Sequence, residues 1–157
     1  MANRSPVITV ALLMLIAACS GSENATDVPA AQPAGASNVE IGEHIVHFSA
    51  LATDQLPPEV ARAYNIVRSK NRAMLNVSVL RKSDSKAVAA TVTVKTVNLT
   101  GQLKNVTMRQ INEGDAIYYI GETPVANRET LIFDISVTPE GVKQASAVRF
   151  KRQFYTD

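Results

Sequence analysis

The chain has 157 residues, with 16 lysines and arginines against 14 aspartates and glutamates, one cysteine, two histidines and no tryptophan. This length suits one domain with a short extension. A single cysteine excludes an intramolecular disulfide, a cysteine-rich zinc site and a CxxC redox pair. Because the only histidines, His44 and His47, lie close together in the sequence, none is left elsewhere for a Ser-His-Asp triad.

The N-terminus predicts an export signal. Residues 7–18 are an unbroken apolar run that follows a start with one basic residue, Arg4. As a helix this run spans about 18 Å, which is too short for the roughly 30 Å hydrocarbon core of a bilayer. A secretory signal peptide over residues 1–18 fits better than a transmembrane helix.

The end of this run, Ile16-Ala17-Ala18-Cys19, resembles the lipobox of bacterial lipoproteins. The resemblance implies cleavage before Cys19, a diacylglycerol on its sulfur and acylation of the new amine, and two or more acyl chains anchor a protein stably in a membrane. Ser20 after the cysteine implies, by resemblance to Gram-negative sorting, the periplasmic face of the outer membrane. The alternative is an ordinary signal peptide with a chance cysteine.

Residues 20–38 are rich in Ser, Ala, Pro and Gly, without aromatic residues or apolar periodicity. This composition predicts a disordered tether that follows the lipidated cysteine, so that residues 19–38 link the anchor to a folded domain over residues 39–157.

In the folded domain, apolar and polar residues alternate with a period of two, which predicts β-strands. At residues 130–137, for example, we expect Leu131, Phe133, Ile135 and Val137 to face inward. Turn residues separate these runs, and residues 115–120 are apolar on both faces, as in a central strand. At Thr138-Pro139-Glu140-Gly141 we expect a type I turn with Pro second and Gly fourth. The pattern predicts an all-β, immunoglobulin-like two-sheet sandwich. The seven expected strands lie near residues 40–51, 73–82, 87–97, 103–111, 115–122, 130–138 and 145–155.

One insertion departs from the strand pattern. Residues 56–64 place prolines near a helix start, Glu59 in the first turn, and Val60 and Tyr64 four positions apart. This arrangement predicts a short helix that joins the first two strands.

Several segments of the folded domain carry a resemblance to known proteins: His47-Phe48, Leu56–Tyr64, Arg68–Arg72, Asn76–Leu80, Gly114–Ile120 and Phe150–Asp157. Together they resemble one family of exported bacterial proteins, the domain of unknown function 4426 family. The resemblance covers nearly all of residues 40–157 and implies a small exported β-domain, but it brings no assigned activity and no catalytic or binding residue.

The charge is unevenly distributed, because residues 60–110 hold ten lysines and arginines and one acid. Within this region Arg68, Lys70 and Arg72 are the candidate site for an anionic group, since arginine grips phosphate or carboxylate with two parallel hydrogen bonds. The expected partner is an envelope protein or an anionic envelope polymer. Export and the scarcity of aromatic residues exclude nucleic acid. The alternative is that these bases pair with acids after folding, or hold the helical insertion onto the sandwich.

His44 and His47, with Met74 or Met108, suggest a copper site as a second hypothesis. However, residues three apart on a strand point to opposite faces, so one ion cannot bind both imidazoles without a bulge. The simpler interpretation of both methionines is core packing. The chain contains no HExxH, GxSxG, P-loop or GxGxxG motif. We therefore expect a binding or accessory module of the cell envelope without catalysis or cofactor, and copper handling in the periplasm as the alternative.

Overall fold

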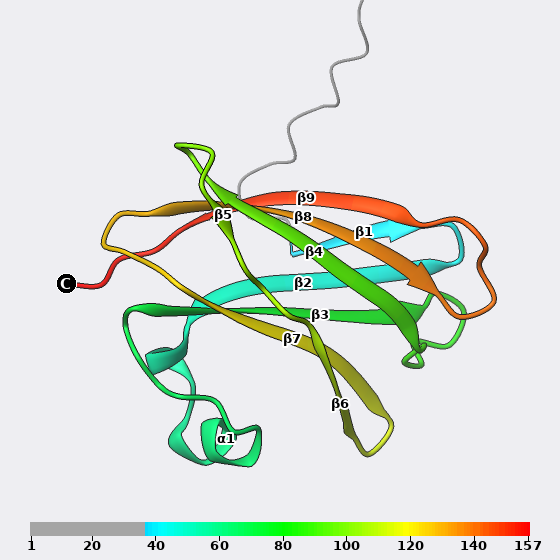
Figure 1. Ribbon diagram of the computed structural model, residues 1–157. Helices are drawn as coiled ribbons and strands as arrows, with labels where there is room; N and C mark the ends of the chain where they lie inside the picture. The colour runs from blue at the N-terminus through cyan, green and yellow to red at the C-terminus, as the bar shows by residue number, and fades with distance from the viewer. Residues whose placement is uncertain (1–36) are drawn as a thin grey trace, which may run out of the picture. The chain divides into compact units, whose positions relative to one another are not determined.

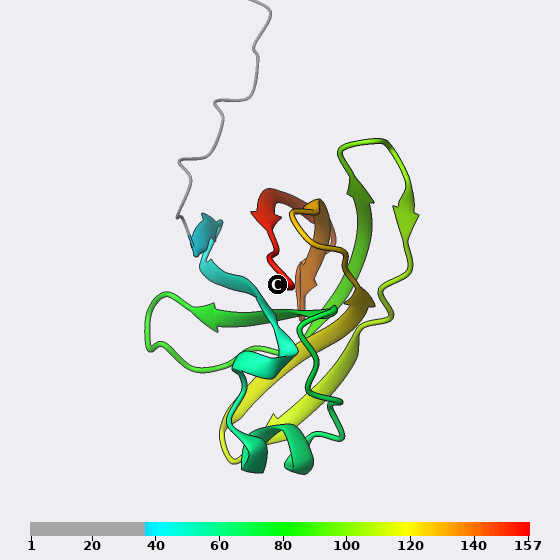
Figure 2. The same cartoon turned by 90° about the vertical axis from the view of Figure 1, so that its left-hand side faces the viewer.

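The computed structural model describes residues 37–157, so the predicted signal peptide, Cys19 and nearly all of the tether lie outside the described residues. The described part is a sandwich of two antiparallel sheets with one short α-helix (Figures 1 and 2). Sheet A has the order β1-β2-β3-β7-β6, and sheet B has the order β5-β4-β8-β9. None of the helices in residues 37–157 is long and apolar enough to span a membrane.

The elements follow one another along the chain in the order of their numbers, with both helical segments between β2 and β3. Their bounds are β1 Asn38–Ile41, β2 His44–Ala52, η1 (a 3-10 turn) Thr53–Gln55, α1 Pro58–Ala63, β3 Arg72–Arg81, β4 Ala90–Asn98, β5 Leu103–Lys104, β6 Arg109–Glu113, β7 Ala116–Pro124, β8 Thr130–Pro139 and β9 Ser146–Gln153.

The strand order confirms the immunoglobulin-like prediction. An immunoglobulin domain places its first, second, fifth and fourth strands in one sheet and its third, sixth and seventh strands in the other. The strands β2-β3-β7-β6 and β4-β8-β9 reproduce both orders, while β1 and β5 are additional edge strands. The predicted helix is also confirmed, because α1 begins with Pro58 and has Glu59 in its first turn.

The prediction of seven strands was wrong, because two of the expected strands are each divided. The segment 40–51 turns back at Gly42, whose φ of +54° suits glycine, and forms the β1–β2 hairpin. The segment 103–111 leaves sheet B after Lys104 and joins sheet A at Arg109. Val106 and Met108 are apolar at alternate positions and so resemble part of a strand, although Leu103 and Ile111 are out of phase with them.

The turn between β8 and β9 also differs from the expected one. It starts one residue later, because Val142 N donates to the Pro139 carbonyl at 3.0 Å, and Pro139 itself ends β8. Gly141 therefore occupies the third position, where its φ of +82° is the left-handed value that a type II turn requires.

The main core lies between the two sheets. Leu131, Phe133, Ile135 and Val137 all point into it, as their alternation predicted. The ring of Phe150 on β9 lies between the sheets, with its centroid 4.9 Å from that of Phe133 and 4.8 Å from that of Phe48 on β2. This aromatic contact joins sheet B to sheet A.

A second, smaller core lies on the outer face of sheet A, under α1 (Figure 2). Ala61 and Ile66 pack there against Met74 of β3 and Ile120 of β7. The strand β7 therefore has apolar neighbours on both faces, since Tyr119 points into the main core. This explains the apolar run at 115–120 and confirms that its strand is central.

Candidate binding site

The predicted basic site lies in the connection from α1 to β3, residues 64–72, which we call the basic connection. Its start is fixed by the end of α1: Ile66 N donates to the Ala61 carbonyl at 2.8 Å and Asn65 N to the Arg62 carbonyl at 3.2 Å. Asn65 has a φ of +53°. These two bonds and the left-handed residue form a Schellman motif, in which asparagine is a common substitute for glycine.

Further along, Thr53 holds the basic connection against η1. The Thr53 side chain is fully buried, and its hydroxyl donates to the Val67 carbonyl at 2.8 Å and accepts from Ser69 N at 2.9 Å. The connection therefore has a defined backbone although it contains no regular secondary structure.

The side chains of the three predicted site residues contact three different parts of the chain. Arg68 Nη2 donates to the Asp54 carbonyl at 2.6 Å, and Lys70 Nζ donates to a main-chain oxygen of Asp157 at 3.0 Å. Arg72 Nη1 lies 3.6 Å from a carboxylate oxygen of Glu122 on β7. Arg68 and Lys70 are exposed and Arg72 is half-buried. The structure thus places all three on one surface segment but does not converge them on one point.

The predicted pairing of bases with acids occurs at Arg72. Glu122 also lies 3.9 Å from Arg109 of β6, so one half-buried carboxylate serves two guanidinium groups. Arg68 differs, because none of the carboxylates within residues 37–157 forms an ion pair with it, and its hydrogen bond goes to a neutral carbonyl. Arg68 is therefore positioned by the backbone without being neutralised.

The basic connection adjoins the outer strand of sheet A. The Tyr64 hydroxyl donates to the Glu113 carboxylate at the end of β6, and this bond raises the pKa of Tyr64. Arg109 of β6 donates in turn to the Tyr64 carbonyl. Because β6 is an edge strand, these contacts put α1 and the basic connection beside an edge that a further strand could join.

The two histidines lie on opposite faces of β2, as expected. His44 shares the face of buried Val46, whereas His47 lies opposite Ser78 on the outer face of sheet A. Within residues 37–157 there is also no group of three or more His, Cys, Asp and Glu residues that could hold a metal ion. Met74 packs in the core under α1 and Met108 against the main core.

His47 borders an open groove of about 960 Å³, where β3 and β7 separate. The pairing of β3 with β7 stops at Val77 and Tyr119, although β7 continues to pair with β6 as far as Ala116. The groove has a mixed lining of apolar side chains and both charges.

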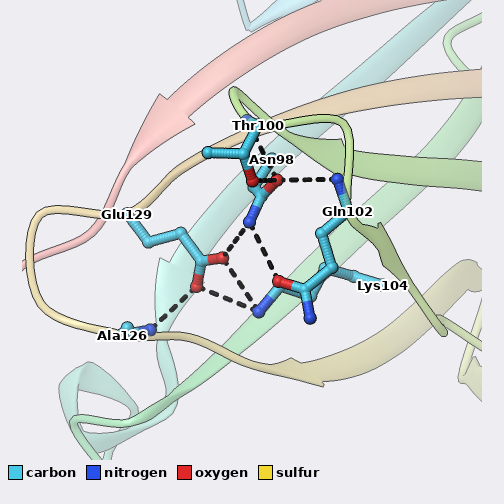
Figure 3. A network of polar contacts seen from close by, with 6 residues as sticks. All are labelled: Asn98, Thr100, Gln102, Lys104, Ala126 and Glu129. Carbon is cyan, nitrogen blue, oxygen red and sulfur yellow. Dashed lines mark hydrogen bonds and ion pairs between the residues drawn. The ribbon is translucent and has the colours of Figure 1, made fainter.

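Sequence reasoning missed a polar network at the base of the β4–β5 hairpin (Figure 3). Glu129 accepts from Lys104 Nζ at 2.8 and 3.1 Å, from Asn98 Nδ2 at 3.0 Å and from Ala126 N at 2.9 Å. Burial alone would raise the pKa of Glu129, but these bonds outweigh it and hold the pKa below its usual range. The residues of this polar network are too far apart in the sequence to form a recognisable motif, so only the fold reveals the network.

Comparison with known proteins identifies the family. The model of the family described as Domain of unknown function (DUF4426) matches residues 38–157. The chain belongs to this family. It is also similar to the crystal structure of a DUF4426 family protein from Pseudomonas aeruginosa PAO1, with 32% identity and a TM-score of 0.67 over 76% of this chain and 94% of that chain. Among curated proteins, none matches the sequence significantly.

The DUF4426 match starts where β1 starts, at Asn38, and therefore includes the whole sandwich, α1 and the basic connection. The family description assigns no activity, so the function of this DUF4426 protein must be argued from its own surfaces.

Proposed function

We propose that this DUF4426 protein is an outer-membrane lipoprotein that faces the periplasm, and that its sandwich acts as a binding or accessory module of the cell envelope. The lipobox-like sequence at residues 16–19 supports an anchor of acyl chains on Cys19. The partner is an envelope protein or an anionic envelope polymer, and the chain itself performs no catalysis.

The observation that supports the binding role is the exposure of Arg68 and its lack of a carboxylate partner in the described part of the chain. The Arg68 guanidinium is held by the Asp54 carbonyl. A guanidinium has five N–H donors, so most of them stay available for a phosphate or carboxylate. Because the basic connection has a fixed backbone, binding there would cost little conformational entropy.

The neighbouring edge strand β6 supplies a second element of recognition. A partner strand could add to β6 through main-chain hydrogen bonds, while its acidic side chains reach the basic connection. We therefore favour a partner segment that is extended and acidic. A copper-handling role is less well supported, since His44 and His47 cannot chelate one ion from opposite faces of β2.

The anchor is tested in cells by metabolic labelling with an alkyne fatty acid, followed by membrane fractionation. We expect the intact chain to take up the label and to fractionate with the outer membrane, and the Cys19→Ser variant to do neither. A Cys19→Ser variant that is labelled and fractionated like the wild type would contradict the lipoprotein assignment.

A further inference from the structure

The outer face of sheet B is open and carries an apolar row at its hairpin end. Leu103, Val97, Ile132 and Lys151 lie directly beside one another, one from each of β5, β4, β8 and β9. Their chain neighbours Thr96 and Phe133 are buried in the core, so this row points outward. With strands about 4.8 Å apart, the row crosses the full width of the sheet, about 14 Å.

The β4–β5 hairpin extends this row beyond the body of the sandwich (Figures 1 and 2). Its leucines, Leu99 and Leu103, are 68% and 63% exposed, which is unusual for large apolar side chains. The hairpin is nevertheless well fixed, because the Asn98 side chain accepts from Thr100 N and Gln102 N and donates to Glu129 (Figure 3). The two leucines are therefore presented on a rigid support.

The same face is basic. At the outward-facing positions of the four strands of sheet B, Asp134 is the one acidic residue, against Lys95, Arg149 and Lys151. Asp134 already accepts two hydrogen bonds from Arg149, while Lys95 and Lys151 are exposed and form no ion pair within residues 37–157. Exposed leucines flanked by unpaired bases are the combination that binds the interface of an anionic bilayer.

We propose that sheet B docks, by its outer face, on the anionic bilayer surface in which the Cys19 acyl chains are inserted. Leu99 and Leu103 enter the interface, and Lys95 and Lys151 contact lipid phosphates. This inference rests on the proposed lipid anchor. The 18 peptide steps from Cys19 to Ser37 span at most about 60 Å, which lets the face reach the membrane but does not by itself orient it.

The docked orientation has a consequence for the binding role. The basic connection and α1 lie over the outer face of sheet A, on the opposite side of the sandwich from the outer face of sheet B. Docking through sheet B therefore leaves β6 and the basic connection directed away from the membrane, where a partner can reach them.

The test uses the intact acylated chain in vesicles of phosphatidylcholine, with or without phosphatidylglycerol. Cys19 is the single native cysteine and its sulfur is blocked by acylation, so an environment-sensitive dye attaches to a Thr100→Cys variant at position 100 alone. A Ser49→Cys variant carries the dye on the outer face of sheet A as the control. Lipid-borne nitroxides then report the proximity of each dye to the bilayer.

We expect quenching at position 100 in vesicles with phosphatidylglycerol, much weaker quenching in phosphatidylcholine alone, and little at position 49 in either. Adding Lys95→Gln/Lys151→Gln should lower the ratio of docked to undocked chain about 25-fold, or about fivefold for each base. Leu99→Ser/Leu103→Ser should also reduce quenching. The matched Arg62→Gln/Lys86→Gln pair removes the same charge from the side of sheet A and should have little effect.

The outcomes separate the docking from the anchor. A chain that floats with the vesicles but shows no quenching at position 100, equal quenching in both lipids, or a larger loss from Arg62→Gln/Lys86→Gln would overturn the docking alone. A chain that does not float and takes the dye on Cys19 would overturn the lipid anchor together with the docking that depends on it. Circular dichroism of each variant confirms that the sandwich is folded.

Discussion

The ion pair between Lys104 and Glu129 allows the sharpest prediction about stability. The two side chains are only 14% and 10% exposed, and Lys104 Nζ contacts both carboxylate oxygens. Replacing Lys104 with methionine keeps the apolar stem and removes the charge. Glu129 would then retain the donors Asn98 Nδ2 and Ala126 N.

The expected loss of unfolding free energy lies between the values for exposed and for fully buried ion pairs. Exposed ion pairs contribute about 0.2–1 kcal/mol, whereas breaking a fully buried pair costs about 3–5 kcal/mol. The Lys104–Glu129 pair is largely buried but the carboxylate keeps two donors, so we expect Lys104→Met to lower the free energy of unfolding by about 2 kcal/mol. For a domain of this size, that corresponds to a decrease in Tm of about 8 °C.

The pH dependence has a defined sign. The pKa of Glu129 in the folded state is below its ordinary value near 4.5, so its contribution to stability is complete above that pH. The contribution is lost as the pH falls from there through the folded-state pKa. The difference between wild type and Lys104→Met should therefore be full at pH 7 and should shrink as Glu129 becomes protonated.

The assay is urea denaturation of residues 37–157, followed by far-ultraviolet circular dichroism at neutral and acidic pH. This range contains the whole of the DUF4426 match, residues 38–157. In a double-mutant cycle with Glu129→Gln, the double variant should lose less unfolding free energy than the sum of the losses of the two single variants. A loss below about 0.5 kcal/mol, or an equal loss at both pH values, would refute this account of the network.

Substitutions at three further positions test the packing of the sandwich and the end of α1. Gly121→Ala should destabilise it by about 1–3 kcal/mol in the same urea assay, because the added Cβ would lie 2.5 Å from Val106 Cγ1 and 2.7 Å from Met108 Sδ; a neutral result would disprove this close approach. Phe150→Ala should cost about 3 kcal/mol by removing the ring that joins the sheets, and a loss below 1 kcal/mol would show that the ring is dispensable. Asn65→Gly should be tolerated whereas Asn65→Ala should cost about 1 kcal/mol, measured by thermal melting, and equal melting temperatures would contradict the left-handed helix end.

The fold was largely predictable because local periodicity reports which strands have a buried face. The alternation at residues 130–137 identified β8 and its inward residues, and proline with an early acid identified α1. The crossing between β5 and β6 was not predicted, because Val106 and Met108 are apolar at alternate positions and resemble part of one continuous strand. The chain packs closely against Gly121 at this crossing, and that contact is distant in the sequence.

The candidate site was predictable in its location but not in its electrostatics. Sequence showed Arg68, Lys70 and Arg72 as one basic cluster, and in the structure Arg68 and Lys70 are exposed whereas Arg72 is half-buried. The sharing of Glu122 between Arg72 and Arg109, and the lack of a comparable partner for Arg68 in the described residues, depend on how β6 and β7 pair. The sequence also did not indicate that the edge strand β9 is basic. The C-terminal third of the sequence is acidic on average, but its acidic residues lie outside β9.

The central claim is that the basic connection recognises a partner in the cell envelope. Crosslinking in living cells followed by purification of the intact chain tests it most directly, with Arg68→Ala/Arg72→Ala compared against Arg149→Ala/Lys151→Ala, which removes the same charge from sheet B. We predict a specific crosslinked partner that soluble residues 37–157 displace, that the first double variant loses and that the second retains. An identical partner profile for wild type and Arg68→Ala/Arg72→Ala would contradict the claim and assign these arginines to holding α1 on the sandwich.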